Sequence, residues 1–143
     1  MIEISQKEDF TQLVEIWESA VKHTHHFLKV EDFEFYKSQI PFYFTQVQLY
    51  VYREDSGEIK GFLGVDGTMI EMLFVSQPYR GTGVGSQLLQ FALNSLGADK
   101  VDVNEENKQA LGFYTHWGFK RIGRSAVDGA GKNYPILHLQ LEP

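Results

Sequence analysis

Apolar residues in the first quarter of the chain recur at helical spacing. Five of them fall three or four positions apart: Leu13, Ile16, Trp17, Ala20 and Val21. This period predicts a helix with one buried face that runs to about residue 22, and residues 5–8 fit a capping box with serine first and glutamate fourth. A second helix is expected over residues 31–40, with Pro41 ending it because proline has no N–H to donate.

Apolar and polar residues then alternate, which is the pattern of half-buried strands. Residues 47–52, 59–65 and 68–75 each predict a strand. Asp66 and Gly67 separate the last two as a two-residue hairpin turn. Three antiparallel strands in succession are therefore expected.

The second half of the chain alternates between helices and strands. Helices are predicted over residues 84–96 and from residue 104 onward, closed by Gly97 and Gly118 respectively. The remaining strands are expected at residues 2–4, 100–103, 119–127 and 134–141. The resulting order is β-α-α-β-β-β-α-β-α-β-β. Because no linker or repeat interrupts it, we expect a single domain over residues 1–143.

Composition narrows the function classes. The chain has 143 residues and no cysteine, which excludes disulfides, thiolate metal sites and a cysteine nucleophile. Its net charge of −6 argues against nucleic acid as the main partner, since phosphate backbones attract clustered Lys and Arg. No apolar run approaches the roughly 20 residues of a membrane span, and residues 1–4 do not begin a signal peptide. A cytoplasmic protein without membrane contact is expected.

The most specific local feature is a glycine turn at residues 77–86, placed between a predicted strand and a predicted helix. Glycines alternate at positions 81, 83 and 85, so backbone N–H groups are expected to point outward at a helix N-terminus and bind phosphate. No Gly-Lys-Ser/Thr follows, which excludes a Walker A loop. The preceding strand lies late in an antiparallel meander, which disfavours a dinucleotide fingerprint. A purely structural turn is the alternative.

A second group of residues lies on the predicted helix after residue 104. Asn107 and Tyr114 are seven residues apart, so two helical turns would place them along one face. Ala110 lies between them and is small enough to let a ligand approach that face.

Both groups resemble motifs of one family. Arg80, Gly83 and Gly85, read as Arg-x-x-Gly-x-Gly, resemble the acetyl-CoA pyrophosphate loop of the GNAT (GCN5-related) N-acetyltransferase superfamily. Residues 107–119 resemble its pattern Asn-x-x-Ala-x-x-Phe-Tyr-x-x-x-Gly-Phe. The Thr-His-x-Phe-Leu stretch at residues 24–28 and the Tyr-Pro pair at residue 134 are similar to small bacterial acetyltransferases of the YjaB type.

The resemblance implies an α/β (α+β) fold of the GNAT type: a mixed, mostly antiparallel twisted sheet of about seven strands with four helices on both faces. It implies an enzyme that transfers the acetyl group of acetyl-CoA to a primary amine by direct attack in a ternary complex. The residues that would bind this cosubstrate are Leu73, Phe74, Val75, Arg80, Gly81, Thr82, Gly83, Val84, Gly85, Ser86, Asn104, Asn107 and Tyr114. A non-catalytic acyl-CoA-binding sensor and a structural module are the alternatives.

Two residues are the catalytic candidates. The resemblance implies that Tyr114 gives a proton to the departing CoA thiolate, a task that suits a phenol because it stays protonated at neutral pH. Glu71 lies two residues before Leu73 and is therefore expected on the same strand face, where its carboxylate would take the proton of the amine. A core tyrosine and a solvated strand carboxylate are the respective alternatives. No acyl-enzyme is expected, because the chain has no cysteine and no activated serine is evident.

The acceptor side is less defined. Expected substrate contacts are His25, His26, Phe27 and Tyr134, and a histidine here could also act as a base. A polar helix end is the alternative for the histidines, and a metal site is disfavoured because no carboxylates lie at ligand spacing. Aromatic residues are dense between residues 33 and 52 and are expected in the core or in an acceptor pocket. The acceptor is a small-molecule or peptide amine, and a monomer and a homodimer are both open.

Overall fold

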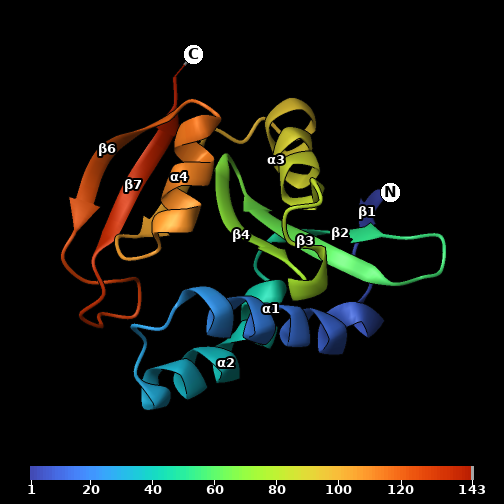
Figure 1. Ribbon diagram of the computed structural model, residues 1–143, viewed down its shortest axis with the longest axis horizontal. Coiled ribbons are helices and arrows are strands. Elements are labelled where there is room, and N and C mark those ends of the chain that lie inside the picture. The colour runs from blue at the N-terminus through green and yellow to red at the C-terminus, as the bar shows by residue number, and fades with distance from the viewer. Residues whose placement is uncertain (143) are drawn as a thin grey trace. The chain divides into compact units, whose positions relative to one another are not determined.

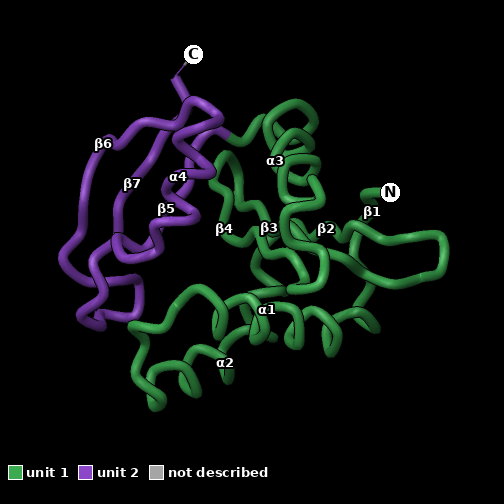
Figure 2. The backbone as a smooth tube through the Cα atoms, in the orientation of Figure 1, with its two compact units in different colours: residues 1–98 green, residues 99–143 purple. Residues whose placement is uncertain are grey.

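Within residues 1–142, seven strands and four α-helices follow one another in the predicted order, with two short 3-10 turns added (Figure 1). The computed structural model describes residues 1–142. It consists of two compact units, Met1–Ala98 and Asp99–Pro143 (Figure 2). Whether they behave as one domain stays a prediction, and each unit is described by itself.

The first unit contains a four-stranded antiparallel meander. Its strands pair in chain order: β1 (Ile2–Ile4), β2 (Gln48–Arg53), β3 (Ile59–Asp66) and β4 (Met69–Val75). Three helices accompany them: α1 (Phe10–Thr24), α2 (Val30–Phe44) and α3 (Val84–Ser95). The antiparallel succession expected from the alternating residues is confirmed for β2, β3 and β4.

Helices cover both faces of this meander. Phe62 on β3 is fully buried in the core cluster that α1 and α2 contribute to. Its neighbour Gly61 lies instead within van der Waals reach of Val84 and Leu88 of α3. Since successive strand residues point to opposite faces, α3 lies on the face away from α1 and α2, as Figure 1 shows. The five apolar residues predicted for the buried face of α1 are all buried.

Several predicted boundaries are wrong, each for a local reason. Pro41 does not end α2 but lies inside it, because burial of Ile40 and Phe44 outweighs the one hydrogen bond that proline cannot donate. The carboxylate that accepts from the N–H of Gln6 before α1 is that of Asp9, at 2.9 Å, not that of the predicted glutamate.

The hairpin between β3 and β4 is shifted by one residue from the prediction. Asp66 is still in β3 and pairs with Met69. The turn is formed by Gly67 and Thr68, with glycine at a φ of 60°. Glycine is favoured at this position because a left-handed backbone conformation crowds any Cβ atom.

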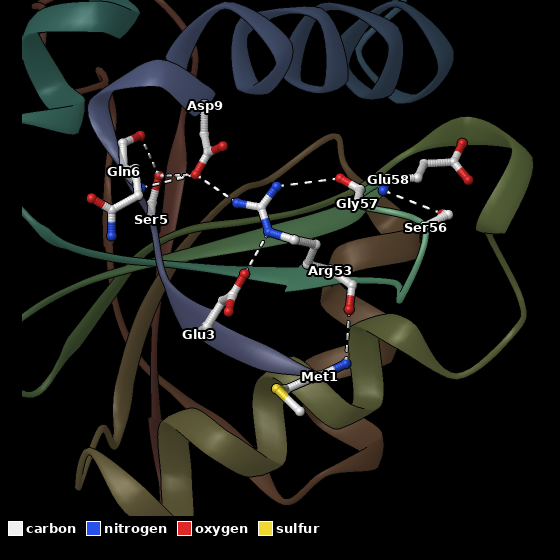
Figure 3. A network of polar contacts seen from close by, with 9 residues as sticks. All are labelled: Met1, Glu3, Ser5, Gln6, Asp9, Arg53, Ser56, Gly57 and Glu58. Carbon is white, nitrogen blue, oxygen red and sulfur yellow. Dashed lines mark hydrogen bonds and ion pairs between the residues drawn. The ribbon is translucent and has the colours of Figure 1, made fainter.

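Arg53 fastens β1 to the rest of the first unit. Its guanidinium donates to Asp9 at 2.8 Å and to the carbonyl of Gly57 at 3.2 Å, and it forms an ion pair with Glu3 (Figure 3). The N-terminal ammonium of Met1 donates to the Arg53 carbonyl at 3.0 Å. One side chain therefore ties a three-residue strand to the segment before α1 and to the turn that follows β2.

The second unit is a three-stranded antiparallel sheet with one helix. Its elements are β5 (Lys100–Asn104), α4 (Lys108–His116), β6 (Phe119–Ser125) and β7 (Ile136–Leu141). β7 lies between β5 and β6. α4 starts four residues later than predicted, and the last two strands are each two residues shorter.

Candidate active site

The glycine turn has the backbone that its sequence predicts. A 3-10 turn, η2 (Gln77–Tyr79), follows β4, and α3 begins at Val84. Gly81 and Gly83 have φ angles of 76° and 93°. A Cβ atom at either position would meet nothing within 4 Å, so glycine is needed here for its backbone conformation and not for space.

The N-terminus of α3 has the features of an anion site. Gly83 is the N-cap and no side chain caps the helix there. The N–H of Gln87 makes the first helical bond, to the Gly83 carbonyl at 3.0 Å. The preceding N–H groups, from Val84 to Ser86, have no acceptor within a helix by geometry, and the helix dipole adds partial positive charge at this end.

Arg80 and Thr82 flank this helix end. Arg80 directly follows η2 and is half-buried. Thr82 donates its hydroxyl hydrogen to the Tyr79 carbonyl. The Tyr79 ring is held in turn by its hydroxyl bond to Glu58 and by Lys60, whose Nζ lies 4.5 Å from the ring centroid. The turn is thus braced by side chains, and the N–H of Thr82 also donates within it, to the Tyr79 carbonyl at 3.3 Å.

Close packing fixes α3 against β3 and β4. A Cβ atom built on Gly61 would lie 2.9 Å from the Phe74 carbonyl oxygen and 3.1 Å from side-chain atoms of both Val84 and Leu88. The absence of a side chain at Gly61 therefore lets α3 pack directly on the backbone of β3. Gly61 also pairs with Val75, so the helix start is positioned beside the end of β4, where Leu73, Phe74 and Val75 are all half-buried.

Glu71 lies on a different face from the one predicted. β3 pairs Gly64 with Met72 but Val65 with Ile70, which leaves Glu71 as the extra residue of a β-bulge. A bulge interrupts the alternation of side chains, so Glu71 lines a pocket together with Met72 and Phe74 and not with Leu73. The assumption of regular alternation was wrong because a one-residue insertion leaves no trace in the apolar pattern.

That pocket has a volume of about 420 Å³ and lies entirely within the first unit. Aromatic and aliphatic side chains from α1, α2 and β4 make up most of its wall. Its polar groups include the carboxylates of Asp66 and Glu71. The lining residues are Trp17, Ile40, Phe42, Tyr43, Gln46, Val47, Asp66, Glu71, Met72 and Phe74. A mainly apolar cavity of this size with a few polar groups is typical of a small-ligand site.

The predicted substrate residues do not line this pocket. His25 is the C-cap of α1, its Nδ1 is 2.7 Å from the Thr24 hydroxyl, and its ring lies 5.2 Å from that of Phe27. Burial, with a smaller contribution from neighbouring His26, lowers the pKa of His25 to about 4. His25 is therefore neutral at pH 7 and a weak base. His26 is exposed, and Tyr134 lies in the second unit, before β7.

In the second unit, the two asparagines predicted to bind the cosubstrate hold backbone groups. Asn104 accepts from the N–H of Glu106 at 3.0 Å. Asn107 is the N-cap of α4 and accepts from the N–H of Ala110 at 3.2 Å. The prediction placed Asn107 inside a longer helix. In the structure it caps the start of α4 instead. Its side-chain oxygen is engaged, which leaves the amide nitrogen as the group that could face a ligand.

Tyr114 is buried in an aromatic cluster on α4. Its ring centroid lies 5.2 Å from that of Phe113 and 5.4 Å from that of Phe119, both near edge-on. Burial raises the pKa of the phenol above its ordinary value, because a charged phenolate would lose its hydration. The hydroxyl therefore stays protonated throughout the neutral range and can only donate its proton when a strong base forms beside it.

Sequence reasoning missed two sets of residues. Asp66 was interpreted only as a turn residue, and its part in the pocket depends on how β3 and β4 pair. The density of aromatic residues did anticipate the contribution of Phe42 and Tyr43. A second set, Asp102, Ser125 and His138, forms a hydrogen-bonded chain across three strands of the second unit.

Comparison with known proteins decides the family. Residues 13–132 match the family model described as an acetyltransferase (GNAT) domain. The chain belongs to the GNAT family. This confirms the resemblance drawn from the glycine turn and from residues 107–119, and with it the predicted acyltransferase activity.

This acetyltransferase is similar over nearly its whole length to the peptidyl-lysine N-acetyltransferase YjaB of Escherichia coli (strain K12). The two are 37% identical over 135 residues, which cover 94% of this chain and 92% of the relative. The solution structure of apo-form YjaB from Escherichia coli matches with a TM-score of 0.91 and 36% identity, over 98% of this chain and 95% of that one.

The fold of the acetyltransferase also matches that of a cofactor complex. The PaiA N-acetyltransferase from Thermoplasma acidophilum, solved in complex with coenzyme A, has a TM-score of 0.71 over 98% of each chain at 20% identity. GNAT acetyltransferases use acetyl-CoA, and the predicted GNAT-like α/β fold is confirmed. Within residues 1–142, no helix combines the length and hydropathy needed to cross a membrane.

Proposed function

We propose that this acetyltransferase transfers the acetyl group of acetyl-CoA to the ε-amino group of lysine in a peptide or protein. The observation that carries the proposal is the pocket of the first unit, whose apolar wall contains the carboxylates of Asp66 and Glu71. A lysine side chain has a matching composition, with an aliphatic stem and a cationic head. The relative YjaB is named as a peptidyl-lysine N-acetyltransferase.

The cosubstrate would be held by the glycine turn and by the end of β4. The N–H groups of residues 83–86 would bind the diphosphate, and Arg80 would add positive charge. The net charge of −6 means that this attraction is local. The backbone of Leu73, Phe74 and Val75 would bind the pantetheine arm. Asn104 and Asn107 stay predicted contacts to the cosubstrate.

Two residues would move protons in the reaction. The amine must be neutral to attack the thioester, so the ammonium head that the two carboxylates attract must first lose a proton. Glu71 would take its proton directly or through water. Tyr114 would donate its proton to the CoA thiolate as the carbon–sulfur bond breaks. Burial keeps the Tyr114 phenol protonated at neutral pH, so its hydroxyl is available to hydrogen-bond to the thiolate as it forms.

A pair of peptides tests the acceptor. One is blocked at its N-terminus and carries a single lysine, and its partner carries norleucine, which has the same stem without the amine. Mass spectrometry is expected to show one added acetyl group on the lysine peptide alone. Initial rates at varied concentrations of both substrates should give intersecting lines, as direct attack in a ternary complex requires. Parallel lines would indicate an acyl-enzyme.

Charge-removing variants test the pocket. Glu71→Gln and Asp66→Asn should each raise KM for the lysine peptide about tenfold or more, since a hydrogen bond to a charged group contributes about 1.5–3 kcal/mol. KM for acetyl-CoA should stay within about twofold. Asp55→Asn, in the exposed turn after β2, is the matched control and should change neither. Equal KM values in all four proteins would remove these carboxylates from acceptor binding.

A further inference from the structure

Three polar side chains form a hydrogen-bonded chain across the sheet of the second unit. The hydroxyl oxygen of Ser125, at the end of β6, is 2.7 Å from Nε2 of His138 on β7. Nδ1 of the same imidazole is 2.6 Å from a carboxylate oxygen of Asp102 on β5. Both distances are within the range found between a nucleophile, its base and the group that orients the base.

The strand register explains how they meet. Asp102 is directly opposite His138 in the β5–β7 pair. On the other side, His138 is opposite Gly123, and Ser125 is two residues further along β6 on the same face. β6 has one extra residue between Arg121 and Gly123, and this bulge determines which face Gly123 and Ser125 occupy. The three strands lie side by side in Figure 2.

The hydrogen-bond partners determine which way the protons point. A carboxylate can only accept, so Nδ1 of His138 carries the hydrogen that bonds to Asp102. In the neutral imidazole Nε2 then has a free lone pair, which accepts the hydroxyl hydrogen of Ser125. This is the tautomer in which histidine can remove the proton of serine as the oxygen attacks an electrophile.

The array is accessible rather than buried. The side chains of His138 and Asp102 are 33% and 44% exposed. Gly123 leaves room beside the ring, since a Cβ atom there would be only 3.4 Å from Cδ2 of His138. β6 is the outer strand of the β5–β7–β6 sheet, and an edge strand presents backbone N–H groups that can stabilise an oxyanion.

The array lies on the opposite face of the sheet from Tyr114. Tyr114 packs on Phe119 of β6, and Phe119 is opposite Leu141 in the strand register. Leu141 and His138 are an odd number of residues apart on β7, so they point to opposite faces. The chemistry assigned to Tyr114 therefore does not account for this array.

The structure assigns to Ser125, His138 and Asp102 a second reaction centre that hydrolyses small activated acyl esters or thioesters. The Ser125 oxygen attacks the acyl carbonyl while Nε2 of His138 takes the hydroxyl proton. The bond to the alcohol or thiol leaving group breaks, and that group departs with the proton. Water then attacks the seryl ester with the same histidine as base, which releases the carboxylic acid and restores Ser125.

Active-site labelling tests this assignment on the unaltered protein. A fluorophosphonate probe is expected to add once, and peptide mapping should place it on Ser125. The protein should release p-nitrophenol from p-nitrophenyl acetate, or CoA from acetyl-CoA without any amine. Comparing the hydrolysis rates of p-nitrophenyl acetate and acetyl-CoA shows whether the centre cleaves oxyesters, thioesters or both.

Variants complete the test. Ser125→Ala, His138→Gln and Asp102→Asn should each lower labelling and hydrolysis at least about tenfold, whereas Ser95→Ala, at the exposed end of α3, should leave both unchanged. Absence of label on Ser125, or the same hydrolysis in Ser125→Ala as in the unaltered protein, would overturn the assignment. Peptide mapping needs no variant, so the result stands even if a substitution impairs folding.

Discussion

Replacing Gly61 with alanine tests whether close packing of α3 on β3 positions the cofactor site. The new Cβ atom would lie 2.9 Å from the Phe74 carbonyl oxygen, whereas ordinary contact begins at 3.4 Å. A backbone atom must therefore move by about 0.5 Å, the difference between these distances. The two 3.1 Å approaches are to side-chain atoms of Val84 and Leu88 on α3, which would have to move by about 0.3 Å.

The magnitude follows from the cost of overpacking. Inserting one methyl group into a closely packed site typically costs about 1–3 kcal/mol. For a chain of this length that corresponds to a fall in Tm of about 3–10 °C. The same movement displaces the start of α3 relative to the Phe74 carbonyl. Since misplacement of about 1 Å can cost about 100-fold in rate, we expect KM for acetyl-CoA to rise about threefold to tenfold.

Thermal unfolding and steady-state kinetics measure both effects. Gly112→Ala is the matched control, because Gly112 lies within α4 and a Cβ atom there would meet nothing within 4 Å. Alanine has the higher helix propensity, so this variant should gain about 0.5–1 kcal/mol. A Gly61→Ala protein with unchanged Tm and unchanged KM for acetyl-CoA would refute the argument that Gly61 sets the position of α3.

Three further predictions address single groups. Tyr114→Phe should lower kcat about 100-fold or more with little change in Tm, and an unchanged kcat would remove Tyr114 from proton transfer. Gly83→Ala and Gly57→Ala should lose similar stability, about 1–2 kcal/mol, because their φ angles of 93° and 92° are equally strained for alanine; only Gly83→Ala should raise KM for acetyl-CoA. The pKa of His25 is lowered to about 4 in the folded protein, so the unfolded chain binds a proton first as pH falls. The contribution of neutral His25 to the free energy of unfolding is therefore complete above about pH 6.5. It is lost toward pH 4, by up to about 3 kcal/mol. Denaturant unfolding between pH 4 and 7 should show a smaller loss for His25→Gln than for the exposed-site control His23→Gln, and equal losses would contradict this explanation.

The sequence predicts those features that depend on residues close together along the chain. The buried face of α1 follows from a helical period that runs without interruption. The glycine turn is equally local, since Gly81 and Gly83 need a left-handed backbone whatever surrounds them. The end of α2 was not predictable, because the burial of Ile40 and Phe44 that keeps the helix intact past Pro41 depends on tertiary packing.

The pocket and the Ser125 array depend on contacts between distant residues. Ser125 and His138 are 13 residues apart, and His138 and Asp102 are 36 apart. No spacing rule connects such residues until the strands are paired. No activated serine is evident from the sequence for this reason, since Ser125 meets His138 only through the β6–β7 register.

Two bulges determine where the polar chemistry of this chain lies. In the first unit, the extra residue on β4 is Glu71, which joins Met72 and Phe74 in the pocket wall. In the second unit, the extra residue on β6 places Ser125 on the face of His138. Without either insertion, strict alternation would turn the polar side chain to the other face of its sheet. The alternation of apolar residues thus specifies the sheet in each unit. One added residue in each then turns the Glu71 carboxylate toward the pocket and the Ser125 hydroxyl toward His138.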